Sequence, residues 1–213
     1  MINKNISKGF FITFEGGEGT GKSTQAKILY DYLISNNIKT VLTREPGGCE
    51  ESEAIRKLLV KGSIDKWDSI TEALLHNAAR REHIKRVIQP SLLANKVVIC
   101  DRFTDSTMAY QGQGQGVNQK FLINLIQEVT ENIMPDLTFV FDMDIKNSLT
   151  RANKRDKNNN RYEKFNNDFH QKIRTYFLSL VNKDKRYILI DASDSIENIG
   201  KIILNKLNKI VTK

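Results

Sequence analysis

One short segment limits what this chain can fold into more than any other. Residues 16–23 read GGEGTGKS and satisfy the pattern G-x-x-x-x-G-K-[ST]. The segment follows an apolar stretch at residues 10–15 and precedes a helical pattern of apolar residues that begins at Lys22. In that setting, backbone N–H groups and a helix N-terminus surround phosphate groups. The segment therefore predicts a strand, a phosphate-binding loop and a helix that together bind a nucleoside triphosphate.

The loop also predicts particular roles for its side chains. Lys22 is expected to reach the β- and γ-phosphates, and the Ser23 hydroxyl is placed to ligate Mg²⁺. The predicted ATP-binding residues are Gly16, Gly17, Glu18, Gly19, Thr20, Gly21, Lys22, Ser23 and Thr24. A GTPase switch is disfavoured, because no Asp has Gly three positions later and residues 182–185 read NKDK instead of N-K-x-D. The chain is also short for a motor or a helicase.

The rest of the chain alternates between apolar bursts and helical patterns. The bursts lie at residues 9–15, 39–43, 96–101, 137–141 and 186–191. Near-continuous apolar runs of this length are typical of strands buried on both faces of a parallel sheet. Helices are predicted at residues 22–36, 52–61, 71–94, 119–132, 145–154, 166–181 and 195–211. This alternation indicates an α/β doubly wound fold.

The glycines gather in three clusters, at residues 16–21, 47–48 and 112–116. Each cluster is expected to follow a predicted strand. In an open α/β sheet, ligands bind outside the carboxyl ends of the strands. The three clusters therefore predict a binding site along one edge of the sheet.

Composition restricts the setting and the partners. The 213 residues are expected to form a single domain, 1–213, without a disulfide, and the isolated Cys49 and Cys100 indicate a reducing, cytoplasmic protein. No stretch approaches the ~20 apolar residues of a membrane span. The net charge of +8 suits an anionic partner but does not choose among nucleic acid, a membrane surface and a phosphorylated metabolite.

A strand end at Asp101-Arg102 adds chemistry to the phosphate-binding loop. Asp101 is placed to orient Mg²⁺ or its water, or to act on the proton of an acceptor. Arg102 is able to hold an acceptor phosphate through two hydrogen bonds, which lysine cannot do. A structural salt bridge at the strand end is the alternative for this pair.

Several ordered motifs resemble the bacterial thymidylate kinase family. They are FEGGEGTGKSTQ at residues 14–25, TREPGG at 43–48, LLHNAAR at 74–80, DRF with Ser106-Thr107 and AYQG at 101–112, and a weaker match at 151–163. The resemblance implies transfer of phosphate from ATP to dTMP with Mg²⁺. It also implies a P-loop NTPase fold with a five-stranded parallel sheet flanked by helices, a mobile basic lid at about 151–163 and a homodimer.

The same resemblance implies roles for individual residues. Arg102, with Arg44, would hold the acceptor phosphate, while Arg80 and Thr107 would contact the base and Tyr110 would exclude a ribose hydroxyl. The implied dTMP-binding residues are Glu18, Arg44, Glu45, Pro46, His76, Arg80, Arg102, Ser106, Thr107, Tyr110 and Gln111. The implied metal-binding residues are Ser23, Glu18 and Asp101. The Glu45–Pro46 bond is expected to be cis.

The lid is expected to supply a catalytic arginine. Some family members carry an arginine in the loop at the position of Gly19, which this chain lacks. An arginine on the migrating phosphoryl group contributes ~10³–10⁵ in rate. The candidates are Arg151, Arg155 and Arg161, beside the catalytic Lys22 and Asp101.

One position departs from the family pattern. The resemblance places phenylalanine, stacked on thymine, where this chain has His76. His76 either stacks on the base or turns away from it. An unperturbed imidazole titrates near pH ~6.5, so the contact is expected to change between pH 6 and 8.

Two other functions remain compatible with the residues. A deoxynucleoside kinase also uses a phosphate-binding loop and an acidic-Arg strand end, but it accepts thymidine in place of dTMP. A nucleic-acid-binding ATPase is suggested by the net charge alone and predicts a strong salt dependence of oligonucleotide binding. We therefore expect a kinase with ATP and dTMP as its partners, and with neither nucleic acid nor a membrane.

Overall fold

The fold is built on a parallel sheet whose order places β1 in the centre. A computed structural model describes residues 8–155 and 161–211. The strand order is β2-β3-β1-β4-β5, and each neighbouring pair is parallel. The strands are β1 (Phe10–Gly16), β2 (Thr40–Arg44), β3 (Val97–Asp101), β4 (Leu137–Asp142) and β5 (Tyr187–Asp191). The predicted five-stranded parallel sheet is therefore confirmed.

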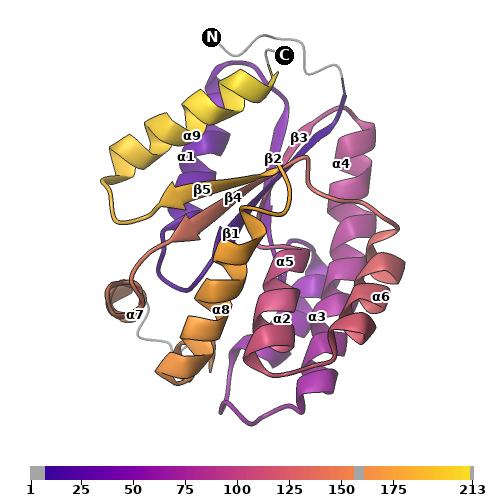
Figure 1. Ribbon diagram of the computed structural model, residues 1–213. Coiled ribbons are helices and arrows are strands. Elements are labelled where there is room, and N and C mark those ends of the chain that lie inside the picture. The colour runs from indigo at the N-terminus through magenta and orange to yellow at the C-terminus, as the bar shows by residue number, and fades with distance from the viewer. Residues whose placement is uncertain (1–7, 156–160, 212–213) are drawn as a thin grey trace.

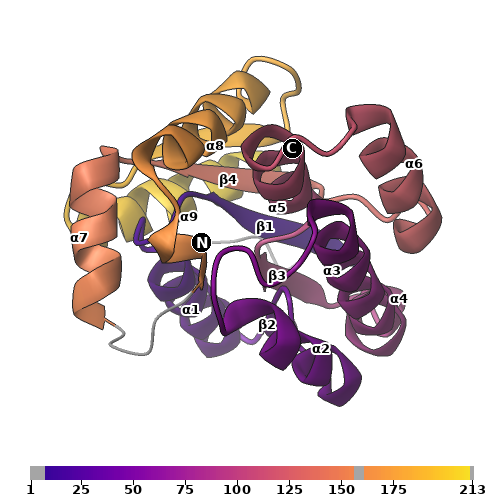
Figure 2. The ribbon, with the colours of Figure 1, turned by 90° about the horizontal axis from the view of Figure 1, so that it is seen from below.

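Alternate residues of the central strands enter two different cores. Ile12 and Phe14 of β1 pack with Leu29 and Leu33 on one face of the sheet, while Phe11 packs with Val98 on the other. Figures 1 and 2 show α1 and α9 on the first face, with α8, α5 and α4 on the second. Because both faces are covered, the strands are apolar almost throughout, which is the pattern seen in the sequence.

The helices agree with the predicted segments except in two regions. The longer helices are α1 (Lys22–Ser35), α2 (Glu50–Val60), α3 (Ser69–His83), α6 (Gln119–Thr130), α7 (Ile145–Arg155), α8 (Asn167–Leu180) and α9 (Ile196–Val211). Short helical pieces are η1 (Ile84–Ile88), α4 (Gln89–Leu93), α5 (Thr104–Thr107), η2 (Met108–Gly114) and η3 (Arg161–Lys164). Within the described residues, no helix is both long enough and apolar enough to cross a membrane.

The first difference concerns the predicted helix at residues 71–94. The structure divides this segment into α3, the π-helical turn η1 and α4. Pro90 stands in the first turn of α4. Proline has no N–H for the carbonyl four residues earlier, so the hydrogen-bond pattern changes where it enters a helix.

The second difference concerns the glycine cluster at residues 112–116. Gly112 and Gly114 lie inside the π-helical turn η2, beyond α5, and do not follow β3 directly. Gly114 is in close contact with the ring of Phe169, which would meet any Cβ placed there. The expectation that all three clusters follow a strand is therefore wrong for this one, because here glycine permits helix packing.

The register of the sheet brings the important strand ends to one level. Asp101 of β3 pairs with Phe14 of β1 and with Arg44 of β2. The loop after β1, the motif after β2 and the turn after β3 therefore meet at one edge, as expected. The Glu45–Pro46 peptide bond is cis, which confirms that prediction.

Candidate active site

The loop after β1 has the geometry of a phosphate-binding loop. It runs from Gly16 to Gly21, and α1 begins at Lys22 with Gly21 in the left-handed region (φ 87°). Lys22 Nζ donates to the Gly17 carbonyl at 2.5 Å and to Thr20 Oγ1 at 3.2 Å. Burial, followed by the positive charge of Arg102, lowers the pKa of Lys22 to about 8. The ammonium group therefore lies within the loop that it is expected to serve.

Gly19 lies directly against α7. Its φ is 69°, and a Cβ at this position would collide with the Ser148 carbonyl group and lie 3.0 Å from Ala152 N. Any larger side chain at Gly19 would have to displace the backbone of α7. The absence of a side chain at Gly19 thus allows α7, which carries Arg151 and Arg155, to pack against the loop.

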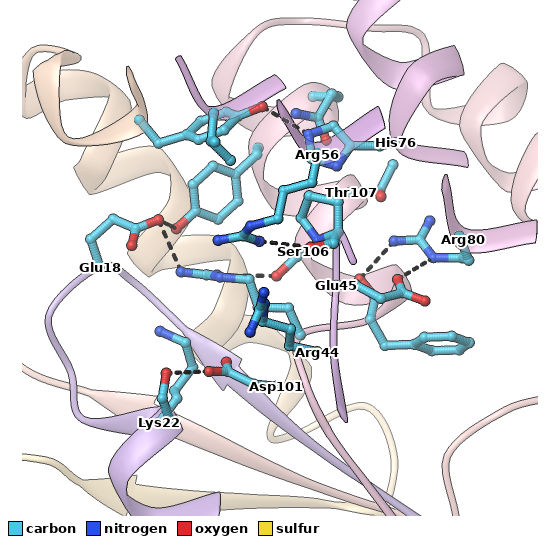
Figure 3. A pocket seen from close by; sticks show the side chains of 18 of the residues that line it. Glu18, Lys22, Arg44, Glu45, Arg56, His76, Arg80, Asp101, Ser106 and Thr107 are labelled. Atoms are coloured by element: carbon cyan, nitrogen blue, oxygen red, sulfur yellow. Dashed lines mark hydrogen bonds and ion pairs between the residues drawn. The ribbon is translucent and has the colours of Figure 1, made fainter. Parts of the chain in front are cut away.

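A cavity opens beside this loop. Figure 3 shows Lys22 and Asp101 at one end of it, with His76, Thr107 and Arg80 toward the other. Sixteen predicted site residues line it: Glu18, Gly19, Gly21, Lys22, Ser23, Arg44, Glu45, Pro46, His76, Arg80, Asp101, Arg102, Ser106, Thr107, Tyr110 and Gln111. Residues from the P-loop, β2, α3, β3 and η2 therefore converge on one space.

The end of the cavity next to the loop contains two neighbouring oxygen groups, from Ser23 and Asp101. Ser23 Oγ donates a short hydrogen bond to Asp101 Oδ2. Among the residues that the structure describes, Asp101 Oδ1 is buried and has no hydrogen-bond partner. A hydroxyl and a carboxylate with an unpaired oxygen suit Mg²⁺, which prefers oxygen ligands. Glu18, the third predicted metal ligand, lines the same cavity, but its Oε1 accepts hydrogen bonds from Arg102 and Tyr110.

The Arg102 side chain is held in place by three acceptors. Nη1 donates to the Gly16 carbonyl at 3.0 Å and to Ser106 Oγ at 3.1 Å, and Nη2 donates to Glu18 Oε1 at 3.0 Å. The Arg102 guanidinium also lies 5.0 Å from the centre of the Tyr110 ring. Its backbone has φ 73°, in the left-handed region that side chains rarely adopt. Arg102 is thus a fixed positive group beside the P-loop.

Glu15, which the sequence did not single out, secures the turn that carries Arg102. Glu15 Oε1 accepts from the Phe103 backbone N–H at 2.7 Å, and Oε2 accepts from Ser106 Oγ at 2.6 Å. The side chain is fully buried at the end of β1. Burial, followed by the neighbouring charge of Asp105, raises the pKa of Glu15 to about 8. A buried carboxyl group therefore joins β1 to the turn that carries Arg102.

Arg80 occupies the far end of the cavity with its own set of partners. Nε donates to Glu45 Oε2 at 2.7 Å, Nη1 to Asn77 Oδ1 at 2.9 Å and Nη2 to the Phe103 carbonyl at 3.1 Å. These bonds use three of the five guanidinium N–H groups. The orientation of Arg80 is therefore set by the protein before any ligand binds.

His76 lines the cavity and contacts Tyr162. Its Nε2 lies 2.8 Å from the Tyr162 hydroxyl. Burial, together with the positive charges of Arg80, Arg102 and Arg56, lowers the pKa of His76 to about 3. The expectation that His76 titrates between pH 6 and 8 is therefore wrong, because burial disfavours the charged imidazole and the three arginines oppose a further positive charge.

Of the predicted lid arginines, Arg151 and Arg161 are not among the residues that line the cavity. Arg151 is exposed on α7 and donates to the Ala192 carbonyl at 3.1 Å, while Arg155 ends the same helix. Arg161 is fully buried and forms an ion pair with Glu72 of α3. The predicted lid at 151–163 thus begins in α7 and ends in η3, and its residues 156–160 lie outside the described residues.

The remaining predicted nucleotide-binding residues lie around the loop. Gly17 and Thr20 line a small space behind it, next to α7 and α8. Gly16 ends β1, and Thr24 lies in the first turn of α1. These residues lie in the loop or directly after it, and they do not line the main cavity.

Four lining residues were missed: Arg56, Val60, Phe103 and Tyr162. Arg56 and Val60 are four residues apart on α2 and so share one helix face. Arg56 Nη1 donates to the Pro46 carbonyl at 2.6 Å. Arg56 could have been proposed from the sequence, because it lies on the helix that directly follows the TREPGG motif. Tyr162 could not, because only the tertiary fold brings it to the cavity.

Comparison with known proteins shows that most of this chain is similar to one protein family. The sequence model of the family described as thymidylate kinase matches residues 14–203. The thymidylate kinase of Magnetococcus marinus is 44% identical over 197 residues, covering 92% of this chain and 94% of that protein. The thymidylate kinase of Onion yellows phytoplasma is 44% identical over 203 residues, with coverages of 94% and 97%. The crystal structure of thymidylate kinase from Ehrlichia chaffeensis superimposes with a TM-score of 0.76 at 36% identity, covering 94% of this chain and 99% of that one.

Glu15 generates a prediction about pH and stability. Its pKa is about 8 in the folded chain against 4.5 for an ordinary glutamate, so between these values the folded state holds a proton that the unfolded state has released. Stability contributed by the protonated carboxyl group is therefore lost as pH rises through this window. The free energy of unfolding of the native chain, relative to Glu15→Gln, should fall by roughly 1 kcal/mol per pH unit between pH 5 and 8.

Urea unfolding at several pH values measures this difference. Glu82→Gln, at a partly exposed glutamate of α3 paired with Arg86, is the control and should parallel the native chain. Equal pH slopes for the native chain and Glu15→Gln would show that Glu15 is ionised throughout.

Proposed function

The chain belongs to the thymidylate kinase family, and from this premise we propose how its residues phosphorylate dTMP with ATP. The observation that carries the proposal is the Arg102 guanidinium, which is held beside the P-loop by Gly16, Ser106 and Glu18. A fixed guanidinium next to a phosphate-binding loop provides two anion subsites in one cavity. The first would hold the donor phosphates and the second the acceptor phosphate.

The donor subsite is formed by the P-loop. Its backbone N–H groups and the N-terminus of α1 are suited to the phosphates of ATP. Lys22 would exchange its hydrogen bond to the Gly17 carbonyl for one to the β- or γ-phosphate. The catalytic role proposed for Lys22 is therefore to balance the negative charge that moves during transfer.

Mg²⁺ would be held at the donor end by Ser23 and Asp101. The unpaired Asp101 Oδ1 and the adjacent Ser23 hydroxyl support this assignment. Mg²⁺ is usually bound by one or two carboxylates together with substrate phosphates. When bound, the ion neutralises charge on the β- and γ-phosphates. Glu18 would act mainly on the acceptor side, because Arg102 and Tyr110 both donate to it.

The acceptor subsite extends from Arg102 to α3. An oxygen of the dTMP phosphate would attack the γ-phosphorus of ATP in line, and the bond to the β-phosphate oxygen would break. Arg44 and the missed Arg56 line the same region and would help to hold the acceptor phosphate. Tyr110, whose hydroxyl is fixed by Glu18 at 3.0 Å, would lie against the sugar and exclude a 2′-hydroxyl.

The base would lie at the far end, near α3 and η2. There we assign Arg80 to a pyrimidine carbonyl, Thr107 and Gln111 to the amide edge, and His76 to the ring face. All four residues line the cavity. Glu45, Pro46 and Ser106 would position this subsite, since Glu45 bonds to Arg80 and Ser106 bonds to Arg102.

The catalytic arginine is assigned to α7. Arg151 and Arg155 belong to the helix that packs on Gly19 of the P-loop, whereas Arg161 is buried against Glu72. We therefore favour Arg151 or Arg155 as the group that neutralises the migrating phosphoryl. All of these parts are assigned to one domain, 1–213, and to a cytoplasmic setting, which the two free cysteines, Cys49 and Cys100, support.

The acceptor is tested by measuring ADP release with a panel of compounds. dTMP should be the best acceptor among dTMP, dUMP, dCMP, AMP, GMP and thymidine. dUMP should be poorer, because a missing methyl group in an apolar pocket costs about 1–3 kcal/mol. Equal or better use of thymidine would favour a deoxynucleoside kinase, and ATP hydrolysis stimulated by oligonucleotides would favour a nucleic-acid-binding ATPase.

Arg102→Lys tests the acceptor-phosphate subsite. Lysine keeps the charge but loses the planar pair of N–H groups that matches a phosphate. The KM for dTMP should rise at least ten-fold while the KM for ATP changes less than three-fold. Arg44→Lys, at an exposed arginine of the same cavity, is the comparison and should show a smaller effect. Unchanged dTMP kinetics in Arg102→Lys would make Arg102 purely structural.

The homodimer is proposed to form through α3 and α6. These helices pack on each other, and Ile70 and Leu74 of α3 are 50% and 47% exposed while Phe121 of α6 is 38% exposed. Exposed apolar side chains on adjoining helices are typical of an interface. Sedimentation should give twice the chain mass, and Leu74→Glu should give one chain mass. Leu93→Glu, at the 79% exposed Leu93 of α4, should remain a dimer. A monomeric native chain would contradict the proposal.

A further inference from the structure

Glu72 of α3 is a fully buried carboxylate that lies behind the base end of the cavity and bonds to residues that line it. Oε1 accepts from Gln111 Nε2 at 2.8 Å and from Tyr162 Oη at 3.0 Å. It also accepts from Gln115 Nε2 at 3.0 Å. Oε2 forms an ion pair with the fully buried Arg161. Gln111 and Tyr162 line the cavity, whereas Glu72 does not.

This carboxylate determines which way the Gln111 amide points. The guanidinium of Arg161 stays protonated and favours the ionised form of Glu72, which can only accept hydrogen bonds. Gln111 must therefore turn its NH₂ group toward Glu72. The carbonyl oxygen of Gln111 is left as the polar end of the amide on the cavity side. Gln111 thus offers an acceptor, and not a donor, to a ligand.

The same reasoning extends to His76 through Tyr162. The Tyr162 hydroxyl has one proton, and that proton is donated to Glu72. The hydrogen bond of 2.8 Å between this hydroxyl and His76 Nε2 must then be donated by His76. Since the imidazole is neutral, its Nδ1 carries no proton. Through Tyr162, Glu72 therefore leaves His76 Nδ1 as a hydrogen-bond acceptor, just as it leaves the carbonyl oxygen of Gln111 as one.

Arg80 completes the pattern with the opposite polarity. It has donors only, and Glu45, Asn77 and the Phe103 carbonyl hold it at the same end of the cavity. Donors from Arg80 beside an acceptor from Gln111 match a ring that presents a carbonyl group next to an N–H group. Uracil and thymine present this pair, whereas cytosine presents an amino group next to an unprotonated ring nitrogen.

We propose that Glu72 is a specificity-determining positioning residue, which sets the direction of hydrogen bonding in the base subsite so that a 4-keto pyrimidine is accepted and a 4-amino pyrimidine is rejected. This inference rests on the proposed function of the cavity and extends it to a residue that contacts no substrate. Leaving a buried donor and a buried acceptor both mismatched is the physical basis of the rejection.

Kinetics with dUMP and dCMP test the proposal, because these two acceptors lack the same methyl group and differ in the keto and amino edge. The native chain should use dUMP at least a hundred-fold better than dCMP, as judged by kcat/KM. Glu72→Gln should lower this ratio at least ten-fold, because a neutral amide no longer compels Gln111 to turn its NH₂ group away from the cavity. Glu82→Gln on the same helix is the matched control and should leave the ratio unchanged.

A second variant tests the proposal in case Glu72→Gln does not fold. Glu72→Gln leaves the buried Arg161 charge unpaired, which is destabilising. Glu72→Gln with Arg161→Met removes both charges, and it should show the same drop in the ratio; its ratio is decisive if the single variant does not fold. A folded variant with reduced kcat for both acceptors but an unchanged ratio would make Glu72 merely structural.

The kinetics of the native chain distinguish failure of this inference from failure of the proposed function. If it phosphorylates dTMP but uses dCMP as well as dUMP, the polarity proposal is overturned while the kinase assignment stands. If it does not phosphorylate dTMP, the proposed function itself fails.

Discussion

The functional site depends on one buried contact, between the Glu15 carboxyl group at the end of β1 and the turn that follows β3. The hydrogen bonds to the Phe103 N–H and the Ser106 hydroxyl join the P-loop strand to the segment that carries Arg102. Arg102 in turn bonds to the Gly16 carbonyl, so the two segments are connected in both directions. The parallel register of β1 and β3 places these ends at one level. The proposed donor and acceptor subsites are therefore joined by one network of hydrogen bonds.

Three arginines of the cavity are paired with carboxylates before any ligand binds. Arg102 pairs with Glu18, Arg80 with Glu45 and Arg44 with Glu53. Such pairing limits the rotamer freedom of long side chains, so a ligand need not order them again on binding. The pKa of His76 is low mainly because the imidazole is buried, and the positive charges of Arg80 and Arg102 lower it further. Binding of a phosphate is then a redistribution of existing hydrogen bonds.

Much of this arrangement could be predicted from the sequence, because the residues that indicate it are neighbours in the chain. The P-loop follows a buried strand and precedes a helix in the chain itself, and the parallel sheet follows from the apolar bursts. The partners of Glu15 and of Glu72 could not be predicted in this way, since Phe103 and Tyr162 are 88 and 90 residues away along the chain. The burial of Arg161 against Glu72 has the same origin, so spacing alone made Arg161 equivalent to Arg151 and Arg155. Likewise, the pKa of His76 depends on three arginines that only the fold brings together.

The division of the cavity into a donor half and an acceptor half is tested most directly by Lys22→Ala. The hydrogen bonds of Lys22 to Gly17 and Thr20 are not among those that hold Arg80 and Arg102. The variant should lose at least a hundred-fold in kcat, because the β- and γ-phosphate charge loses its partner. Its dissociation constant for dTMP, measured by calorimetry without ATP, should stay within three-fold of the native value. A variant that keeps more than half of the native kcat, or that loses dTMP binding together with catalysis, would contradict the separation of the two subsites.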